Sequence, residues 1–312
     1  MYKFSIQNLY YQWWKNIDKF IFSLIILLFL IGLFFSLVST SLIASDKLNT
    51  NDYLFFFKHL IFLCIGGFFI FTFSSINQEY LFKISIVCFG ASLVLLILVP
   101  LVGVEVKGSK RWIDLYLLPR FQPIELVKPF FIVFLSILLS SQKHVNIYLK
   151  YSLSFFATLG VVFFLVLQPD IGQTLLILFA WSILIFISGI NLIFLITLFF
   201  ILILSFSYLV LFVPKFAYIK SRIISFFDSD TGTHNFQSDK AIESIISGGF
   251  FGKGIGEGVL KNRVPEAHTD YIISVISEEF GVVAIMLILL LFLILIYMVF
   301  KKISFETNDK AK

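Results

Sequence analysis

Long apolar stretches alternate with short polar ones along nearly the whole chain. Stretches long enough to cross a hydrocarbon core, about 20 residues for a helix, recur from end to end. Their apolar residues are continuous and do not alternate strictly with polar ones, which favours helices over barrel strands. The pattern therefore predicts an all-α, polytopic membrane protein.

Eight spanning helices are predicted. The charge-free stretch 171–214 is too long for one span, so it is divided near residues 188–191. No small-residue cleavage site follows the first span, which is therefore expected to be a retained helix. The spans are expected at residues 20–44, 60–78, 84–104, 123–142 and 151–169, on both sides of the break in 171–214, and at 271–300.

Composition supports this class of protein. Hydrophobic residues make up 59% of the chain and charged residues 14%, and the mean hydropathy is +0.98, which excludes a soluble globular domain. Cys64 and Cys88 fall inside predicted spans without a CxxC pair, so they are expected to be buried free thiols. The four histidines are scattered, which argues against a histidine metal site.

The distribution of charge predicts the orientation in the membrane. An even number of spans places both termini on one side, and most lysines near span ends lie there, so the termini are expected to be cytoplasmic. The one long hydrophilic segment, 215–270, is then extracytoplasmic, and its basic and acidic residues balance. No nucleic-acid partner is expected. Some basic residues oppose the rule that Lys and Arg gather on the cytoplasmic side, and they lie mainly in the loop 105–121. Such a basic patch suits a phosphate-bearing ligand. Snorkelling side chains or contacts with lipid headgroups also explain it.

Two charges lie at the start of the predicted fourth span. Glu125 and Lys128 follow Pro123 in the first turns and share one helix face. An ion pair that stabilises the helix start is the simpler interpretation. Their depth instead favours a functional pair in a polar cavity, where losing one partner is expected to cost about 3 kcal/mol or more.

Two further segments interrupt the apolar pattern. In QPDIGQT, residues 168–174, Asp170 is expected to cap the following helix. The segment SGGFFGKGIGEG, residues 247–258, is similar to a phosphate loop, but Lys253 is not followed by Ser or Thr and no strand precedes it, so a nucleotide site is not expected. Its glycines are expected to allow close backbone approach to the bilayer or a ligand.

The segment PEAHTDYIISVISEEFG, residues 265–281, gathers ionisable groups at the edge of the last span. Glu266, His268 and Asp270 lie within five residues, and Glu278 and Glu279 follow about two turns into the span. A metal site and acid or base catalysis by carboxylates are both compatible with this pattern. A helix cap at Asp270 is a third alternative.

Taken in order, these segments resemble the SEDS family (shape, elongation, division and sporulation) over almost the whole chain. The segments GSKRWID (108–114), QPIELVK (122–128), QPDIG (168–172) and 265–281 are similar to the family's G-A-x-R-W-I, Q-P-S-E-x-x-K, Q-P-D-x-G and P-E-x-H-T-D-F-I-F-x-x-x-x-E-E-x-G. Ile124 and Tyr271 depart from the pattern. The segment 104–108, the RWID string and the tryptophans before Asp18 are more similar to the division member than to the elongation member.

The resemblance implies a peptidoglycan glycosyltransferase with a single integral membrane domain, residues 1–312, in the bacterial cytoplasmic membrane at the division septum. Its implied substrate is lipid II, a disaccharide-pentapeptide on an undecaprenyl pyrophosphate carrier. Its implied partners are a class B penicillin-binding protein and other divisome proteins. Asp270 is expected to be the catalytic base with help from Glu266, and the expected substrate-binding residues are Lys110, Arg111, Glu125, Lys128 and His268. No cofactor is assigned, and a divalent cation near Glu266 stays open.

The chain departs from the family in one larger respect. The family has ten spans, and its P-F-I-S-Y-G-G segment near the last span has no counterpart here, so a C-terminally truncated form of uncertain activity is expected. Two other functions are compatible with the residues. One is a flippase or transporter for the same lipid, with Glu125, Lys128 and Asp170 as intramembrane polar sites. The other is a non-catalytic divisome scaffold that recruits a transpeptidase.

Overall fold

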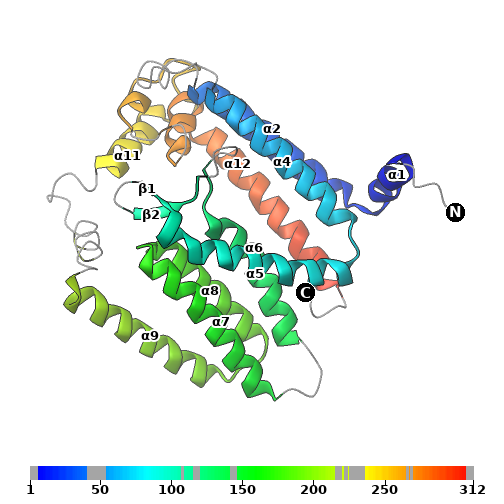
Figure 1. Cartoon of the computed structure of the whole chain (residues 1–312). Helices are drawn as coiled ribbons and strands as arrows, with labels where there is room; N and C mark the ends of the chain where they lie inside the picture. The colour runs from blue at the N-terminus through cyan, green and yellow to red at the C-terminus, as the bar shows by residue number, and fades with distance from the viewer. Residues whose placement is uncertain are drawn as a thin grey trace. The chain divides into compact units, whose positions relative to one another are not determined.

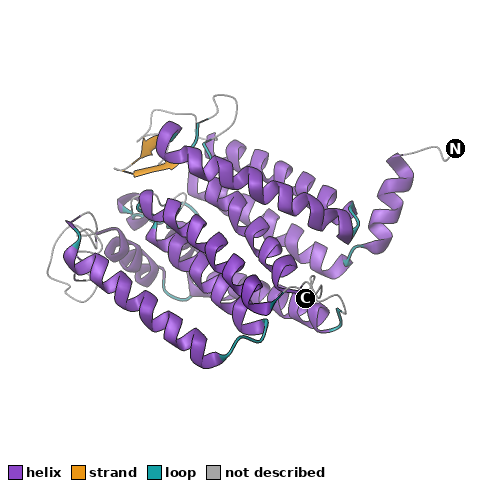
Figure 2. Cartoon of the chain, turned by 60° about the horizontal axis from the view of Figure 1, so that its bottom comes forward, coloured by secondary structure: helices purple, strands orange, loops and turns teal. Residues whose placement is uncertain are grey.

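The structure of the chain is a computed structural model that describes residues 6–40, 54–106, 109–114, 120–140, 146–214, 220, 224, 236–264, 267 and 270–306. The described part consists of helices and one short antiparallel hairpin (Figure 1). The main helices are α1 (Ile6–Asn16), α2 (Lys19–Thr40), α4 (Leu54–Ser75), α5 (Gln78–Val102), α6 (Pro123–Ser140), α7 (Ile147–Leu167), α8 (Ile171–Ile187), α9 (Leu192–Phe212), α11 (Phe236–Gly248) and α12 (Ile272–Ser304). The hairpin joins β1 (Val104–Val106) to β2 (Ser109–Trp112), the pair of strands in Figure 2.

The prediction of an all-α membrane protein is confirmed. Seven of the described helices are long and apolar enough to cross a membrane, and α8, with 17 residues, is shorter. Each predicted span coincides with one of these eight helices, while the number that cross the bilayer stays a prediction. The break in 171–214 is confirmed, because α8 is capped by Ser188 and Gly189 adopts a φ of +88° before α9 begins.

The prediction for the two cysteines is only half right. Both are free thiols, but Cys64 on α4 is exposed and Cys88 on α5 is only partly buried. The physical reason is that the outer face of a spanning helix meets lipid, which is as apolar as a protein core. An apolar side chain in such a helix therefore need not pack against protein.

The described residues divide into two compact units. Unit 1 comprises Met1–Ser75 with Ser207–Phe305, and unit 2 comprises Ile76–Phe206 with Glu306–Lys312. In unit 1, α2 packs against α4 and α12, and α11 packs against α12 (Figure 1). The rings of Phe35 and Phe280 join α2 to α12 at a centroid distance of 5.3 Å.

The amphipathic helix α1 is anchored to unit 1 by one buried indole. Trp13 meets the ring of Phe22 edge-on and lies 5.1 Å from the ring of Phe71, centroid to centroid. Its ring N–H donates to the hydroxyl of Ser74 at 2.6 Å, which satisfies the polar end of the side chain. The sequence analysis did not predict α1 or α11, because both are too short and too polar to form a span.

An ion pair joins the start of α2 to the end of α12. Oδ2 of Asp18 lies 2.6 Å from Nζ of Lys302, and Oδ1 accepts from the backbone N–H groups of Phe20 and Ile21. The hydrogen bond from Lys302, followed by the bond from Ile21, lowers the pKa of Asp18 below its ordinary value of 3.8.

This pair predicts a specific dependence of stability on pH. Because the folded pKa of Asp18 is lowered, the contribution of the pair to the free energy of unfolding is complete above the ordinary pKa of 3.8. It is lost as the pH falls through the folded pKa. Asn caps a helix nearly as well as Asp, so Asp18→Asn removes mainly the charge. We expect the variant to unfold at a lower temperature at pH 7 and the difference to shrink toward pH 2. A difference that is independent of pH in detergent-solubilised protein would contradict the ionic origin.

Unit 2 is built around α5, α6, α7 and α8, and α6 contacts each of the other three. Its buried core comprises Phe89, Leu96, Ile124, Val127, Phe131, Leu135, Val161, Leu165, Ile177, Trp181 and Ile185. Two polar side chains are satisfied within it. Nε1 of Trp181 donates to the hydroxyl of Ser154 at 3.3 Å, and the amide of Gln168 donates to the carbonyl of Leu96 at 3.2 Å. The second bond fixes the turn between α7 and α8 against α5.

Candidate functional site

Arg111 is held by the turn between α7 and α8. From β2, its Nε donates to the carbonyl of Gln168 at 3.2 Å and its Nη2 donates to the carbonyl of Pro169. Nη1 lies 3.8 Å from Oδ1 of Asp170. The guanidinium is a planar fork with five N–H donors, so it can serve all three acceptors at once. The hairpin and the turn therefore form one polar assembly within unit 2.

Asp170 combines two functions in this assembly. At the N-cap position of α8 its side chain accepts from the backbone N–H of Gln173 at 3.5 Å, which confirms the predicted cap. The residue is also buried, and Arg111 provides the counter-charge that a buried carboxylate requires. The cap prediction was correct but did not include the ion pair.

Glu125 and Lys128 form the predicted pair on α6. Nζ of Lys128 lies 2.7 Å from Oε2 of Glu125, and the amide of Gln173 donates to Oε1 of Glu125 at 3.2 Å. The side chain of Glu125 is 54% exposed from protein atoms and that of Lys128 is 22% exposed, while the expected polar cavity at membrane depth stays a prediction. Glu125 stands in the first turn of α6, where the helix leaves the hairpin segment. If water reaches the pair, losing one partner costs 0 to about 1 kcal/mol, and the expected cost of about 3 kcal/mol or more applies only at membrane depth.

Arg111→Lys tests the assembly of hairpin and turn. A single ammonium cannot reproduce the fork, so we expect a loss of about 2 kcal/mol from its charge-assisted hydrogen bonds. Arg120→Lys is the matched control, because Arg120 pairs with Asp114 at 2.9 Å but is more exposed. Thermal unfolding in detergent measures both variants. Equal destabilisation by the two substitutions would contradict a larger contribution of Arg111 to the stability of the protein.

The other predicted site residues lie apart from the pair of Glu125 and Lys128 in the sequence. Lys110 is exposed in β2, paired in register with Glu105 across the hairpin. Asp270 is exposed in the turn before α12, in unit 1. The N-cap residue of α12 is Tyr271, so Asp270 does not occupy the cap position. Glu266 and His268 lie outside the described residues, and their assignments stay predictions.

The predicted last span is interrupted at Gly281. This residue has φ 77° and ψ 178°, so residues 272–280 form a separate short helix within α12. At the break, the segment 249–254 provides hydrogen-bond partners for the free backbone groups of both helix ends. The N–H groups of Lys253 and Gly254 donate to the carbonyls of Glu278 and Glu279, at 2.9 and 3.0 Å.

Gly252 of this segment and Gly281 each approach the chain's own backbone, while the expected approach to the bilayer or a ligand stays a prediction. A Cβ on Gly252 would lie 2.1 Å from the carbonyl oxygen of Glu279, and one on Gly281 would lie 2.2 Å from that of Phe250. Both residues also have positive φ values. Only glycine satisfies both conditions at these two positions.

Glu278 is the central side chain of this junction and is 0% exposed. Its Oε1 accepts from the backbone N–H groups of Val259 and Leu260, both at 2.9 Å, and lies 3.5 Å from Nζ of Lys253. Its Oε2 accepts from the hydroxyl of Ser244 at 3.1 Å. All four neighbours are donors, which suits an ionised, acceptor-only carboxylate. The adjacent Glu279 accepts from the N–H of Gly256 at 3.3 Å.

The sequence analysis placed Glu278 and Glu279 in the last span but gave them no role. The available signal was the combination of two carboxylates in an apolar run with a glycine-rich segment some 20 to 30 residues earlier. A buried carboxylate needs several donors, and closely approaching backbone can supply them. Both features therefore belong to one junction.

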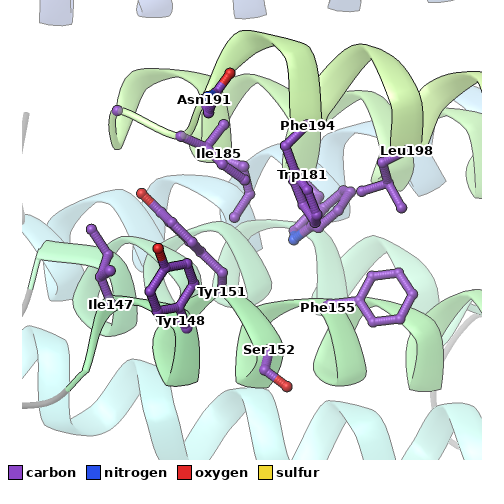
Figure 3. Close-up of a pocket in the computed structure, with 12 residues that line it drawn as sticks. Ile147, Tyr148, Tyr151, Ser152, Phe155, Trp181, Ile185, Asn191, Phe194 and Leu198 are labelled. Atoms are coloured by element: carbon purple, nitrogen blue, oxygen red, sulfur yellow. The ribbon is translucent and has the colours of Figure 1, made fainter.

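A separate apolar cavity of about 650 Å³ lies in unit 2 (Figure 3). It is lined mainly by aromatic and aliphatic side chains of α7, α8 and α9, including Tyr151, Phe155 and Trp181. None of the predicted site residues lines it. Across the described residues, no group of three or more potential ligands could hold a metal ion.

Comparison with known proteins decides the family. The profile of the FtsW/RodA/SpoVE family, described as cell cycle proteins, matches residues 18–312. The chain belongs to this family. One relative is the probable peptidoglycan glycosyltransferase FtsW of Haemophilus influenzae. It is 32% identical to this chain, over 91% of the chain and 72% of the relative. The FtsW of Taylorella equigenitalis, with the same description, is 34% identical over 80% of the chain and 69% of the relative.

Solved structures agree with the assignment to the FtsW/RodA/SpoVE family. A peptidoglycan synthase complex, described as coordinating polymerization and crosslinking, contains a chain with a TM-score of 0.70 and 26% identity, over 92% of this chain and 78% of the other. The rod shape determining protein RodA of Thermus thermophilus has a TM-score of 0.62 and 26% identity, over 92% and 75%. The chain is thus an integral membrane protein of the family, most similar to FtsW.

Proposed function

We propose that this chain is a peptidoglycan glycosyltransferase that polymerises lipid II into glycan strands during cell division. The observation that carries the proposal is the match, over 91% of the chain, to a relative described as a probable peptidoglycan glycosyltransferase. The site agrees with a substrate that is partly in the membrane, because polar residues lie at the ends of long apolar helices. The reaction joins a sugar hydroxyl of one lipid II to the anomeric carbon of another, with undecaprenyl pyrophosphate as the leaving group.

Each candidate residue has a chemical task in this proposal. Asp270 takes the proton of the attacking hydroxyl, and a carboxylate at a membrane edge is suited to this task. Arg111 and Lys110 face the negative charge of the pyrophosphate, for which guanidinium groups are well shaped. The pair of Glu125 and Lys128 extends the polar surface next to Arg111.

The remaining assignments follow from the same proposal. Glu266 assists Asp270 or binds a divalent cation, and His268 orients the turn. The partners are a class B penicillin-binding protein and other divisome proteins, and the chain is a single membrane domain at the septum of the bacterial cytoplasmic membrane. The termini are cytoplasmic and the 215–270 segment is extracytoplasmic, as the lysine distribution indicates.

Reconstitution tests the function directly. The full-length protein is placed in vesicles with lipid II in the outer leaflet and without ATP or an ion gradient. A polymerase makes glycan strands under these conditions. The strands are labelled and then separated by gel electrophoresis. If lipid II only changes leaflet, the chain is a flippase. If it neither moves nor reacts while a transpeptidase still binds, the chain is a scaffold.

A further inference from the structure

The geometry of α12 defines where the bilayer boundary falls on it. After the break at Gly281, the remainder of α12 is a helix long enough to cross a hydrocarbon core of about 30 Å. Lys301 and Lys302 in its last turn mark one boundary, because basic side chains prefer the headgroup region. Gly281 lies 20 residues before Lys301, about 30 Å away. The break at Gly281 therefore lies at the opposite boundary.

Phe250 and Phe251 are tied to the helix at this depth. The N–H of Val282 donates to the carbonyl of Gly249 at 3.0 Å, and the N–H of Val283 donates to the carbonyl of Phe250 at 3.3 Å. These bonds satisfy the first free N–H groups after the break. The two phenylalanine side chains are nevertheless 76% and 83% exposed to the surroundings of the protein.

We propose that Phe250 and Phe251 form an aromatic wedge that inserts into the membrane leaflet on the side of the 215–270 segment. The partner is the acyl-chain region just below the lipid headgroups. Ile246 and Ile255 flank the wedge and are also apolar and exposed. Side chains of this type on an interfacial segment are buried about 5–10 Å into the boundary between headgroups and acyl chains.

Lipid is the occupant that the position favours. At the same level of α12, Val282 and Val283 are also apolar and exposed. The acyl chains of a leaflet at this depth provide the apolar surroundings that the wedge requires. The support is also rigid, since the segment behind the wedge bonds to the backbone of Glu278 and Glu279.

Depth-dependent fluorescence tests the wedge without reference to enzyme activity. In a full-length protein with Cys64→Ala and Cys88→Ala, an environment-sensitive dye is attached at Phe251→Cys, or at Phe250→Cys as a second reporter. Ser238→Cys is the matched control, because it is an exposed polar position on α11. Each protein is reconstituted alone into vesicles of phosphatidylethanolamine and phosphatidylglycerol, with or without nitroxide-labelled acyl chains.

The dye at positions 251 and 250 is expected to emit at shorter wavelength, to be quenched by the nitroxide lipids and to be shielded from iodide in the water. The dye at position 238 is expected to show the reverse. Equal iodide quenching at all three positions overturns the proposal. Shielding at 251 that appears only after a bitopic transpeptidase is added also overturns it, and assigns the surface to a protein partner.

Discussion

Glu278→Met is expected to destabilise the protein by about 4 kcal/mol, because a buried acceptor is removed while its donors stay in place. Methionine has a similar length but leaves the N–H groups of Val259 and Leu260 without their acceptor, at about 1–3 kcal/mol each. The loss of the contact with Lys253 adds less, since that side chain is 38% exposed and water can solvate it. The predicted effect is therefore mainly a hydrogen-bond effect.

Glu278→Gln is the matched control for this effect. Its carbonyl oxygen can still accept from both N–H groups, and its amide can donate to the hydroxyl of Ser244. We expect its unfolding temperature in detergent to stay much closer to wild type than that of Glu278→Met. Equal loss in the two variants would show that the charge, rather than the acceptor geometry, holds the junction together.

Asp270→Asn is expected to lower the rate of glycan polymerisation by about 100-fold or more, the range for removing a general base. Asparagine has nearly the same shape, but its amide cannot accept the proton of a sugar hydroxyl. The residue lies in the turn before α12, and Tyr271 holds the cap position, so loss of a helix cap should not contribute. Folding and binding of the transpeptidase are expected to be unchanged.

The control for Asp270→Asn is an exposed carboxylate of the same 215–270 segment. Glu257 is exposed in the turn after the wedge, and it has no task in the proposed chemistry. We expect Glu257→Gln to polymerise lipid II at close to the wild-type rate. If Glu257→Gln lost activity as strongly as Asp270→Asn, the effect would reflect the net charge of the segment and not a base.

The membrane helices could be predicted from sequence because their signal is local. Each of the eight apolar stretches became a helix, and the polar residues 188–191 marked the turn between α8 and α9. The pairing of Glu125 with Lys128 was also predictable, since residues at i and i+3 share a helix face. Local spacing could not reveal the half-exposure of Glu125, which depends on where α6 starts relative to its surroundings.

The junction around Glu278 depends on contacts between distant segments. Its donors come from residues 244, 253, 259 and 260, which approach only because glycines admit the backbone. Periodicity also predicted one continuous last span, since the break at Gly281 is a matter of backbone angle and not of hydropathy. The partners of Arg111 are likewise carbonyl groups some 57 residues away, and backbone carbonyls carry no signature in a sequence.

Glycan-strand formation from lipid II by matched proteins tests the central claim most directly. Full-length wild type, Asp270→Asn and Glu257→Gln are reconstituted at equal density with lipid II in the outer leaflet, and strand length and rate are read from gels. The account predicts strands from wild type and Glu257→Gln and essentially none from Asp270→Asn. Strands from Asp270→Asn at the wild-type rate would contradict the assignment of Asp270 as the base.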